Sequence, residues 1–309
     1  MSGEPSFSVV VPTHARPAAL ALCLEALARL DYPRDAFEVV VVDDDGGIPL
    51  DGIVACYRDR LDVTLAVQDR AGPSAARNAG VRRAKGEYVA FTDDDCRPEP
   101  GWLRALAARF EKDREAAVGG RTVNGLPRNA FARASQLVVD LVYAHYNDDP
   151  ECARFLASNN VAFPADGFQE AGGFDESFRT SEDRELCDRW VAGGRRLVYA
   201  PEAGVEHVRD VRLGGFLSQH FGYGRGAFRF HRARARRGSS SLQGHVRFHL
   251  RLPRLLRSAP SETGALRSPS VVALLFAWQL ANALGFAWEG TRFALAAGRR
   301  GRPQERTLE

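Results

Sequence analysis

Two runs of three aspartates are the residues in this chain with the most evident chemical use. Asp43–Asp45 and Asp93–Asp95 each follow a short apolar run directly. Neighbouring carboxylates repel one another, so a folded chain keeps three together where positive charge balances them. Hard divalent cations such as Mg²⁺ and Mn²⁺ prefer oxygen ligands of this kind. The phosphates of a nucleoside diphosphate compound would complete the coordination shell of such a cation.

The segments around the triplets are typical of buried strands that alternate with helices. Phe7–Thr13 is a continuous β-branched run, and "FEVVVVDDDGG" and "EYVAFTDDD" have the same character. Leucines at helical spacing over Pro17–Leu30 predict a helix with Pro17 in its first turn. We therefore expect an α/β fold with a mostly parallel central sheet covered by helices on both faces.

The carboxyl ends of these strands carry the polar residues. In parallel sheets the ligand binds at this edge, and here the strand ends are Pro12–His14, Asp43–Asp45 and Asp93–Asp95. One acidic triplet alone would be read as a solvated turn, because aspartate is common after strands. Two triplets at equivalent strand ends favour a binding site instead.

The segment "GPSAARNAG" (Gly72–Gly80) belongs to the same edge and opens into a helix. Arg77 can offer its forked donors either to a phosphate or to an aspartate. The N-terminus of the helix would present free N–H groups to an anion, and Ser74 is a possible N-cap.

Seven motifs in one order together resemble family-2 glycosyltransferases with the GT-A fold. Each motif is weak alone, and the ordered set is specific. They are "VVVPTHAR" (Val9–Arg16), "VVVDDDG" (Val40–Gly46), "GPSAARNAG" (Gly72–Gly80), "FTDDDC" (Phe91–Cys96), "SNNVAF" (Ser158–Phe163), "GGFDESF" (Gly172–Phe178) and "SEDREL" (Ser181–Leu186).

The resemblance implies a nucleotide-sugar site and a divalent cation. The donor would be a UDP-, GDP- or dTDP-linked sugar, held by Pro12, Thr13, Arg16, Asp43, Asp44, Arg77, Asp93 and Asp94. Whether Asp43 or Asp44 faces the base stays open, because three acids precede Gly46 where the family has two. Asp95 would ligate Mn²⁺ or Mg²⁺. His207 resembles a later metal ligand, and a lone histidine after a strand is as often structural.

The resemblance also implies an inverting transfer to an acceptor hydroxyl, with Asp183 as the general base beside Glu182. A carboxylate in hydrogen-bond reach can take the hydroxyl proton in the transition state. The cation, helped by an arginine, would stabilise the diphosphate leaving group. The alternative is that Asp183 is only a helix N-terminal charge, with Ser181 as the cap.

Several residues are candidates for the acceptor side. Asn159 and Asn160 would bind sugar hydroxyls or cap a turn. Gln219, Tyr223 and Arg225 would contact the diphosphate or the acceptor, and the alternative is a solvated basic helix. The family's Q-x-x-R-W pattern is absent there. The acceptor would be a sugar, a lipid-linked sugar or a small molecule.

The C-terminal third differs from the rest in charge. Net charge is only +3, but Val211–Ser261 contains no acid and many arginines. Leu242–Arg257 mixes leucine, phenylalanine and arginine, which suits peripheral contact with an anionic membrane. No nucleic-acid motif accompanies it, so we expect no nucleic-acid partner. An apolar helix at about 270–297 would dock at the membrane or on the catalytic domain rather than span a bilayer.

The whole chain is thus expected to comprise a GT-A catalytic domain (1–210) and a basic helical region (211–309). Five scattered cysteines and the lack of a visible signal peptide predict a cytoplasmic protein, peripheral at the inner face of the membrane. Its role would lie in bacterial cell-envelope polysaccharide, glycolipid or metabolite glycosylation. The alternatives are a nucleotidyltransferase and a non-catalytic sugar-nucleotide or lipid-head-group binding protein. The sequence leaves the oligomeric state open.

Overall fold

The computed structural model of the chain describes residues 4–238, 248, 250–252, 254, 256 and 268–300. Most of the basic stretch 242–257 therefore lies outside the described residues. The helices are α1 (Pro17–Leu27), η1 (Arg34–Ala36), α2 (Asp51–Ala55), α3 (Pro73–Val81), α4 (Trp102–Phe110), α5 (Ala130–Tyr146), η2 (Pro150–Cys152), α6 (Ala165–Glu170), α7 (Glu182–Ala192), α8 (Leu213–Arg236) and α10 (Pro269–Arg300).

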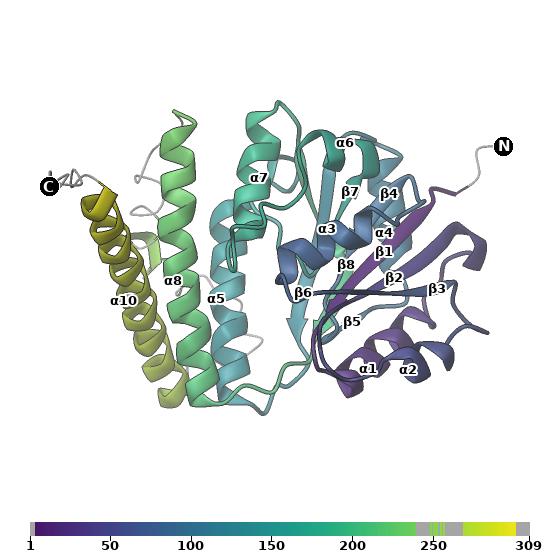
Figure 1. Cartoon of the computed structure of the whole chain (residues 1–309), viewed down its shortest axis with the longest axis horizontal. Helices are drawn as coiled ribbons and strands as arrows, with labels where there is room; N and C mark the ends of the chain where they lie inside the picture. Colours follow the sequence, from purple (N-terminus) through teal and green to yellow (C-terminus); the bar gives the residue numbers. More distant parts are fainter. Residues whose placement is uncertain are drawn as a thin grey trace, which may run out of the picture.

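One sheet of eight strands forms the centre of the molecule, as Figure 1 shows. Its spatial order is β3 (Val63–Gln68), β2 (Phe37–Asp44), β1 (Phe7–Thr13), β4 (Tyr88–Phe91), β7 (Val161–Pro164), β6 (Ala117–Asn124), β8 (Leu197–His207) and β5 (Cys96–Pro98). Strands β3, β2, β1 and β4 run parallel, as does the pair β6 and β8. Strands β7 and β5 run antiparallel to their neighbours, so the sheet is mixed.

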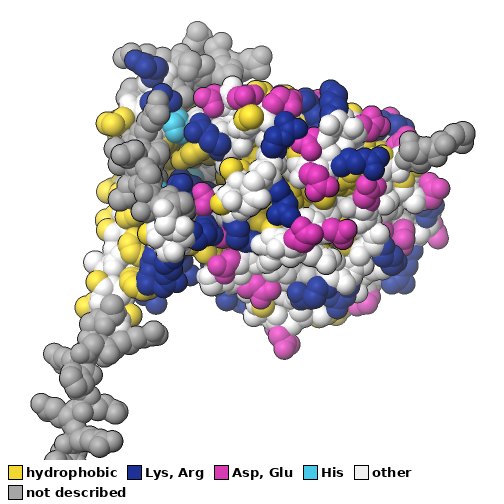
Figure 2. Space-filling model, turned by 90° about the horizontal axis from the view of Figure 1, so that it is seen from above, with side chains coloured by type: hydrophobic (Ala, Val, Ile, Leu, Met, Phe, Trp, Pro, Cys, Tyr) yellow, Lys and Arg dark blue, Asp and Glu magenta, His cyan; other side chains and the backbone are white. Residues whose placement is uncertain are grey.

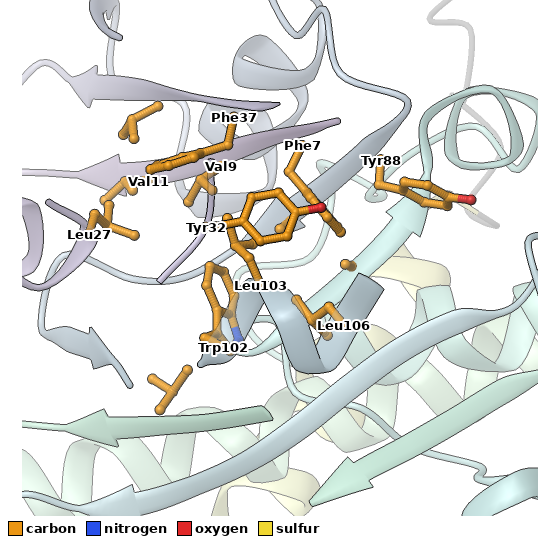
Figure 3. Packing of buried hydrophobic residues seen from close by; sticks show 14 of the residues in the cluster. Phe7, Val9, Val11, Leu27, Tyr32, Phe37, Tyr88, Trp102, Leu103 and Leu106 are labelled. Atoms are coloured by element: carbon orange, nitrogen blue, oxygen red, sulfur yellow. The ribbon is translucent and has the colours of Figure 1, made fainter. Parts of the chain in front are cut away.

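Both faces of the first strands are buried, which explains their unbroken apolar sequence. Every residue of β1 and β2 is buried. Successive side chains point to opposite faces, so Val9 and Val11 join one core cluster and Val10 joins another. Figure 3 shows the first cluster, in which Trp102 and Leu106 of α4 pack near Val9 and Phe7 of β1. This packing fixes the strand ends that carry the acids.

A layer of three helices stands at one end of the sheet. Helices α5, α8 and α10 lie side by side (Figure 1) and share a separate apolar cluster. Its members include Ala134, Leu137, Val138 and Leu141 of α5, Phe216 of α8, and Val271, Leu275 and Trp278 of α10. The expected apolar helix at about 270–297 is therefore docked on other helices.

Glycines set the distance between α8 and α10. A Cβ atom built on Gly224 would lie 2.0 Å from the carbonyl oxygen of Asn282. One built on Gly285 would lie 2.0 Å from the carbonyl oxygen of Phe221. Such contacts are possible only without a side chain, so the two backbones approach closely here. Gly224 of α8 and Gly285 of α10 thus serve the packing of these two helices.

Candidate active site

All three aspartates after β4 are paired with arginine, and two of them share one arginine. Asp93 accepts a hydrogen bond from Arg77 at 2.7 Å. Asp94 is fully buried, accepts from the Thr13 hydroxyl at 2.7 Å and pairs with Arg16 at 2.5 Å. Burial raises the pKa of Asp94 to about 6, against the pull of Arg16 and Thr13. Asp95 pairs with the same Arg16 at 2.6 Å. The positive charge that balances the triplet in this structure is therefore arginine.

Asp95 also lies beside His207, at the place where a cation was expected. The Asp95 Oδ1 and His207 Nε2 atoms are 3.3 Å apart. Strand pairing causes this proximity, because β5 aligns Cys96 with His207 at the end of β8. Burial acts to raise the pKa of Asp95, but His207 and Arg16 outweigh it and hold that pKa below its usual range. Asp95 is therefore ionised.

The donor atoms of Asp95, Cys96 and His207 lie within 4.8 Å of one another. A carboxylate with an imidazole suits Mn²⁺ better than Mg²⁺, which prefers oxygen ligands, when substrate phosphates and water complete the shell. The Cys96 thiol is fully buried, and burial raises its pKa well above its ordinary value. The residues present thus fit a hard cation held by Asp95 and His207, with Cys96 as a core side chain.

The triplet after β2 separates into two roles. Both oxygens of Asp44 are engaged, by the backbone N–H groups of Ala71 and Gly72 at 2.7 and 2.8 Å and by Gln68 at 2.9 Å. Within the described part of the chain, the Asp43 carboxylate accepts one hydrogen bond, from the Gly46 N–H at 2.9 Å. Asp44 therefore fastens the loop before α3, and Asp43 is the acid with the freer carboxylate.

The N-terminus of α3 differs from the expectation. Gly72, with a φ of 98°, is the N-cap residue, and Pro73 occupies the first turn. The Ser74 hydroxyl donates to the carbonyl of Phe178 instead of capping the helix. The predicted N-cap at Ser74 is wrong, because a proline-led turn and the carboxylate of Asp44 already fix this segment.

Asp183 lies in the first turn of α7, two residues after Ser181, whose backbone is strained. Ser181 has left-handed backbone angles (φ 66°, ψ 18°) and makes no side-chain cap. The Arg184 N–H donates to Asp183 at 2.7 Å. Burial, followed by the charge of Glu182, raises the pKa of Asp183 to about 7. A carboxyl group that titrates near neutral pH is suited to general base catalysis.

Arg77 links the acidic triplet to the Glu182–Asp183 pair. Its guanidinium is almost fully buried and donates to Asp93 at 2.7 Å and to Glu182 at 3.1 Å. The ring of Phe174 lies 5.5 Å from the guanidinium carbon. Of the two partners that the sequence left open for Arg77, phosphate or aspartate, the structure shows the aspartate. Two motifs far apart in the chain are thereby held together.

Of the two asparagines expected on the acceptor side, Asn160 is a structural residue. It is fully buried, accepts from the Trp102 indole at 2.8 Å, and donates to the carbonyls of Arg121 and Ala203. These contacts engage its side-chain amide within the protein, and its expected contact with a sugar hydroxyl stays a prediction. Asn159 is partly exposed, and its amide nitrogen lies 3.6 Å from the Cys96 sulfur.

Helix α8 places its candidates on different faces. The Gln219 amide donates to the Tyr223 hydroxyl at 2.7 Å. Arg225 instead donates to Glu289 of α10 at 2.7 Å. In this structure the Arg225 side chain joins two helices, and its expected contact with the diphosphate or the acceptor stays a prediction. The sequence could not reveal this pairing, because the two residues are 64 positions apart.

The α8 face that bears Gly222 and Gly226 packs on the loop before α7. The Thr180 hydroxyl donates to the Gly222 carbonyl at 2.9 Å. A Cβ atom on Gly226 would lie 2.5 Å from the hydroxyl oxygens of Thr180 and Ser181. Sequence reasoning missed this contact, and also the left-handed backbone of Ala15, Asp45 and Ser181. No residue type signals these features, since glycine is absent from the strained positions.

Comparisons with known proteins agree with this geometry. The model of the family "Glycosyl transferase family 2" matches residues 8–167, and that of "Glycosyl transferase family group 2" matches residues 88–297. The chain therefore belongs to the family-2 glycosyltransferases, a class of enzymes.

Named relatives are glycosyltransferases of different specificity. The pre-mycofactocin glycosyltransferase of Mycobacterium tuberculosis is 30% identical over 223 residues, which cover 70% of this chain and 46% of that protein. The validoxylamine A glucosyltransferase of Streptomyces hygroscopicus is 30% identical over 236 residues, which cover 66% of this chain and 56% of that protein. The chain thus spans about half the length of these curated relatives.

Solved structures support the GT-A fold. The mannosyltransferase PcManGT from Pyrobaculum calidifontis, in complex with GDP-Man and Mn²⁺, matches with a TM-score of 0.64 at 23% sequence identity. The match covers 96% of this chain and 81% of the PcManGT chain. S. aureus TarS in complex with UDP-GlcNAc has a TM-score of 0.54 at 18% identity and covers 97% of this chain and 93% of its own. The expected fold class is confirmed.

Proposed function

We propose that this protein transfers a sugar from a nucleotide-diphosphate sugar to an acceptor hydroxyl, with inversion and with help from a divalent cation. Family membership supports sugar transfer. The observation that carries the finer proposal is the bridge of Arg77 between Asp93 and Glu182. It keeps the expected cation loop and the expected base in one site.

On the donor side, Pro12, Thr13 and Asp43 would bind the nucleoside. Asp95 and His207 would hold Mn²⁺ or Mg²⁺, and a neighbour of the same fold is in complex with GDP-Man and Mn²⁺. When bound, the cation would balance charge on the departing diphosphate. Arg16 now pairs with Asp94 and Asp95, and its half-exposed side chain can turn toward the phosphates instead.

On the acceptor side, Asp183 would take the proton of the attacking hydroxyl. A base must be ionised to accept a proton, so a pKa near 7 makes the reaction faster as pH rises toward neutrality. Gln219 and Tyr223 would contact the acceptor, and Asn159 would border it. Glu182 would act through its charge and through Arg77.

We place the catalytic domain in residues 1–210 and the helical region in residues 211–309. The acceptor would be a sugar, a lipid-linked sugar or a small molecule of bacterial envelope or metabolite glycosylation. The two relatives described above are named for pre-mycofactocin and validoxylamine A, which illustrates how different the acceptors could be. The proposed location is cytoplasmic, with peripheral contact to an anionic membrane.

The two alternatives have less support. The relatives named above are glycosyltransferases, which does not favour a nucleotidyltransferase. A non-catalytic binding protein would not need a buried carboxyl group with a pKa near 7 beside the donor site.

The test is the release of nucleoside diphosphate from UDP-, GDP- and dTDP-sugars with Mn²⁺, with a panel of acceptors. For the donor that reacts, Asp183→Asn should lower the rate about 10²–10⁴-fold, because it removes the base. Calorimetry should show that the variant still binds the nucleoside diphosphate. Anomeric analysis of the product by NMR should show inversion.

The matched control is Asp188→Asn, the same chemical change on the same helix. Asp188 pairs with Arg234 and Arg237 of α8 and lies outside the Arg77 bridge. It should leave the rate unchanged. An Asp183→Asn variant as fast as the wild type would contradict the proposed base.

A further inference from the structure

The outer face of α10 is apolar and open to solvent. Large side chains recur every four residues along it at Phe276, Leu280, Leu284 and Trp288, followed by Leu295. Phe276 and Leu280 are 75% and 62% exposed. Figure 2 shows hydrophobic side chains gathered at the edge of the molecule that α10 forms. A row of this size is unusual on a surface that meets only water.

The opposite face of α10 is occupied along its length. Val271, Leu275 and Trp278 pack in the cluster with α5 and α8. Farther on, Gly285 touches the α8 backbone, and Glu289 pairs with arginines of α8. With respect to the described residues, the helix therefore has one side buried against α5 and α8 and one exposed apolar side.

The charges of α10 are arranged to leave its outer face without negative charge. Glu289 is the one acid in the helix and is only 7% exposed. It lies between Arg225 and Arg229, at 2.7 Å from each. Arg292, in contrast, is exposed near the end of the apolar row. A surface of this kind complements anionic groups and repels none of them.

By length and composition α10 could cross a bilayer, since Pro269–Ala296 has a mean hydropathy of 1.6. Its contacts exclude a span in this arrangement. Helix α8 runs beside it with Arg225 and Arg229, and Arg237 of α8 is tied to Glu185 and Asp188 of α7. Moving α10 into hydrocarbon would carry charged α8 with it or break these pairs.

We propose that the outer face of α10 docks on an anionic lipid bilayer, with the helix axis parallel to the membrane surface. Phe276, Leu280, Leu284 and Trp288 enter the interface, and Arg292 meets the headgroups. A half-exposed tryptophan near the end of the row suits the water–lipid boundary. This specifies the surface for the membrane contact proposed above, and it does not depend on the transfer reaction.

Tryptophan fluorescence of the full chain can report this face directly. Trp102 and Trp190 are fully buried, Trp278 is 4% exposed, and Trp288 is 54% exposed. Addition of phosphatidylcholine–phosphatidylglycerol vesicles should shift the emission to the blue, and brominated lipid should quench it. Trp288→Phe should remove both responses. Vesicles of phosphatidylcholine alone should bind more weakly, and salt should weaken the binding to anionic vesicles.

Vesicle flotation then tests the apolar row. Leu280→Glu and Leu284→Glu should each lower partitioning about tenfold or more, as expected for losing one buried leucine. The matched control is Leu22→Glu, which makes the same change at a half-exposed leucine. Leu22 belongs to α1, at the far end of the molecule from α10 in Figure 1. This control variant should partition like the wild type. Circular dichroism establishes that each variant is folded.

Three results would overturn the proposal. The first is wild-type protein that stays in solution with anionic vesicles. The second is membrane association that resists alkaline carbonate, which would mean a span. The third is a dimer in sedimentation that Leu280→Glu dissociates, with no vesicle binding, because the row would then belong to a second copy of the chain.

Discussion

The donor edge of the sheet and the C-terminal helix pair hold charges in contrasting ways. At the donor edge, Arg77 is almost fully buried and pairs with buried Glu182 and partly exposed Asp93. Between α8 and α10, Arg225 and Arg229 share Glu289 and are each about one-third exposed on their side chains. The first network fixes the relative position of two motifs, and the second joins two helices at the surface.

The difference indicates which of the two regions needs an exact backbone geometry. Three non-glycine residues with left-handed backbone, Ala15, Asp45 and Ser181, all lie in loops of the candidate site. The helix pair has none among the residues described, and its close contacts use glycine instead. Strain that the surrounding structure maintains is typical of functional sites.

The largest expected effect comes from breaking the donor-edge network. Arg77→Met should destabilise the fold by about 3–5 kcal/mol, because Asp93 and Glu182 are left without their buried partner. The counterpart Arg225→Met should cost about 1 kcal/mol or less, since Glu289 keeps Arg229 and water screens the pair. Urea denaturation of both variants measures the difference. Equal losses of unfolding free energy would mean that the two networks stabilise the protein equally, which would contradict the contrast drawn above.

Helix α8 offers a second, smaller contrast. A Cβ on Gly226 collides with Thr180 and Ser181, whereas one on Gly222 meets only a Thr180 methyl at 3.7 Å. Gly226→Ala should be less stable than Gly222→Ala by about 1–3 kcal/mol, the cost of overpacking. Because the displaced loop carries the start of α7, Gly226→Ala should also lower kcat by up to about 10²-fold.

The readout that separates positioning from simple instability is the split between kcat and KM. Gly226→Ala should lower kcat with little change in donor KM, measured well below its Tm. Gly222→Ala should match the wild type in both constants. If the two variants behave alike, α8 does not position the catalytic loop.

The smallest effect is a shift of the pH profile. kcat/KM should rise with pH and level off above about pH 7, where Asp183 becomes ionised. In Glu182→Gln the rise should move to lower pH, because the neighbouring negative charge that helps to raise the Asp183 pKa is gone. A profile that stays in place would exclude Asp183 as the group that titrates.

The raised pKa of Asp183 also predicts that the stability of the fold depends on pH. Because folding raises the pKa of Asp183, its contribution to stability is complete in acid and is lost as pH rises through about 7. Asp183→Asn removes this dependence. Its stability relative to the wild type should therefore improve above neutral pH, in urea denaturation at several pH values.

The sheet and the meeting of its acidic strand ends could be predicted from the sequence, because the apolar runs decide them. Unbroken apolar runs required a sheet covered on both faces, and parallel strands required their acidic ends to meet. The family resemblance suggested both Asp95 and His207 as metal ligands, and the structure brings them to 3.3 Å. The division of work between Asp43 and Asp44 could not be predicted, because it depends on where the loop before α3 returns.

The helical side resisted prediction because its contacts are set by tertiary packing. Nothing in the sequence indicated that Arg225 pairs with Glu289 or that Asn160 accepts a hydrogen bond from Trp102. A basic residue or an asparagine has many possible partners, and local spacing does not choose among them. The outer face of α10 could not be told from its inner face, because large apolar residues occur on both.

The most direct test of the account is calorimetric binding of UDP, GDP and dTDP, with and without Mn²⁺, to the wild type and to Asp95→Ala. The account predicts that one nucleotide binds tightly to the wild type with Mn²⁺. It also predicts that removing either the metal or the Asp95 carboxylate abolishes this binding. Binding that ignores both, or folded wild-type protein that binds none of the three, would contradict a metal–diphosphate site at the end of β4.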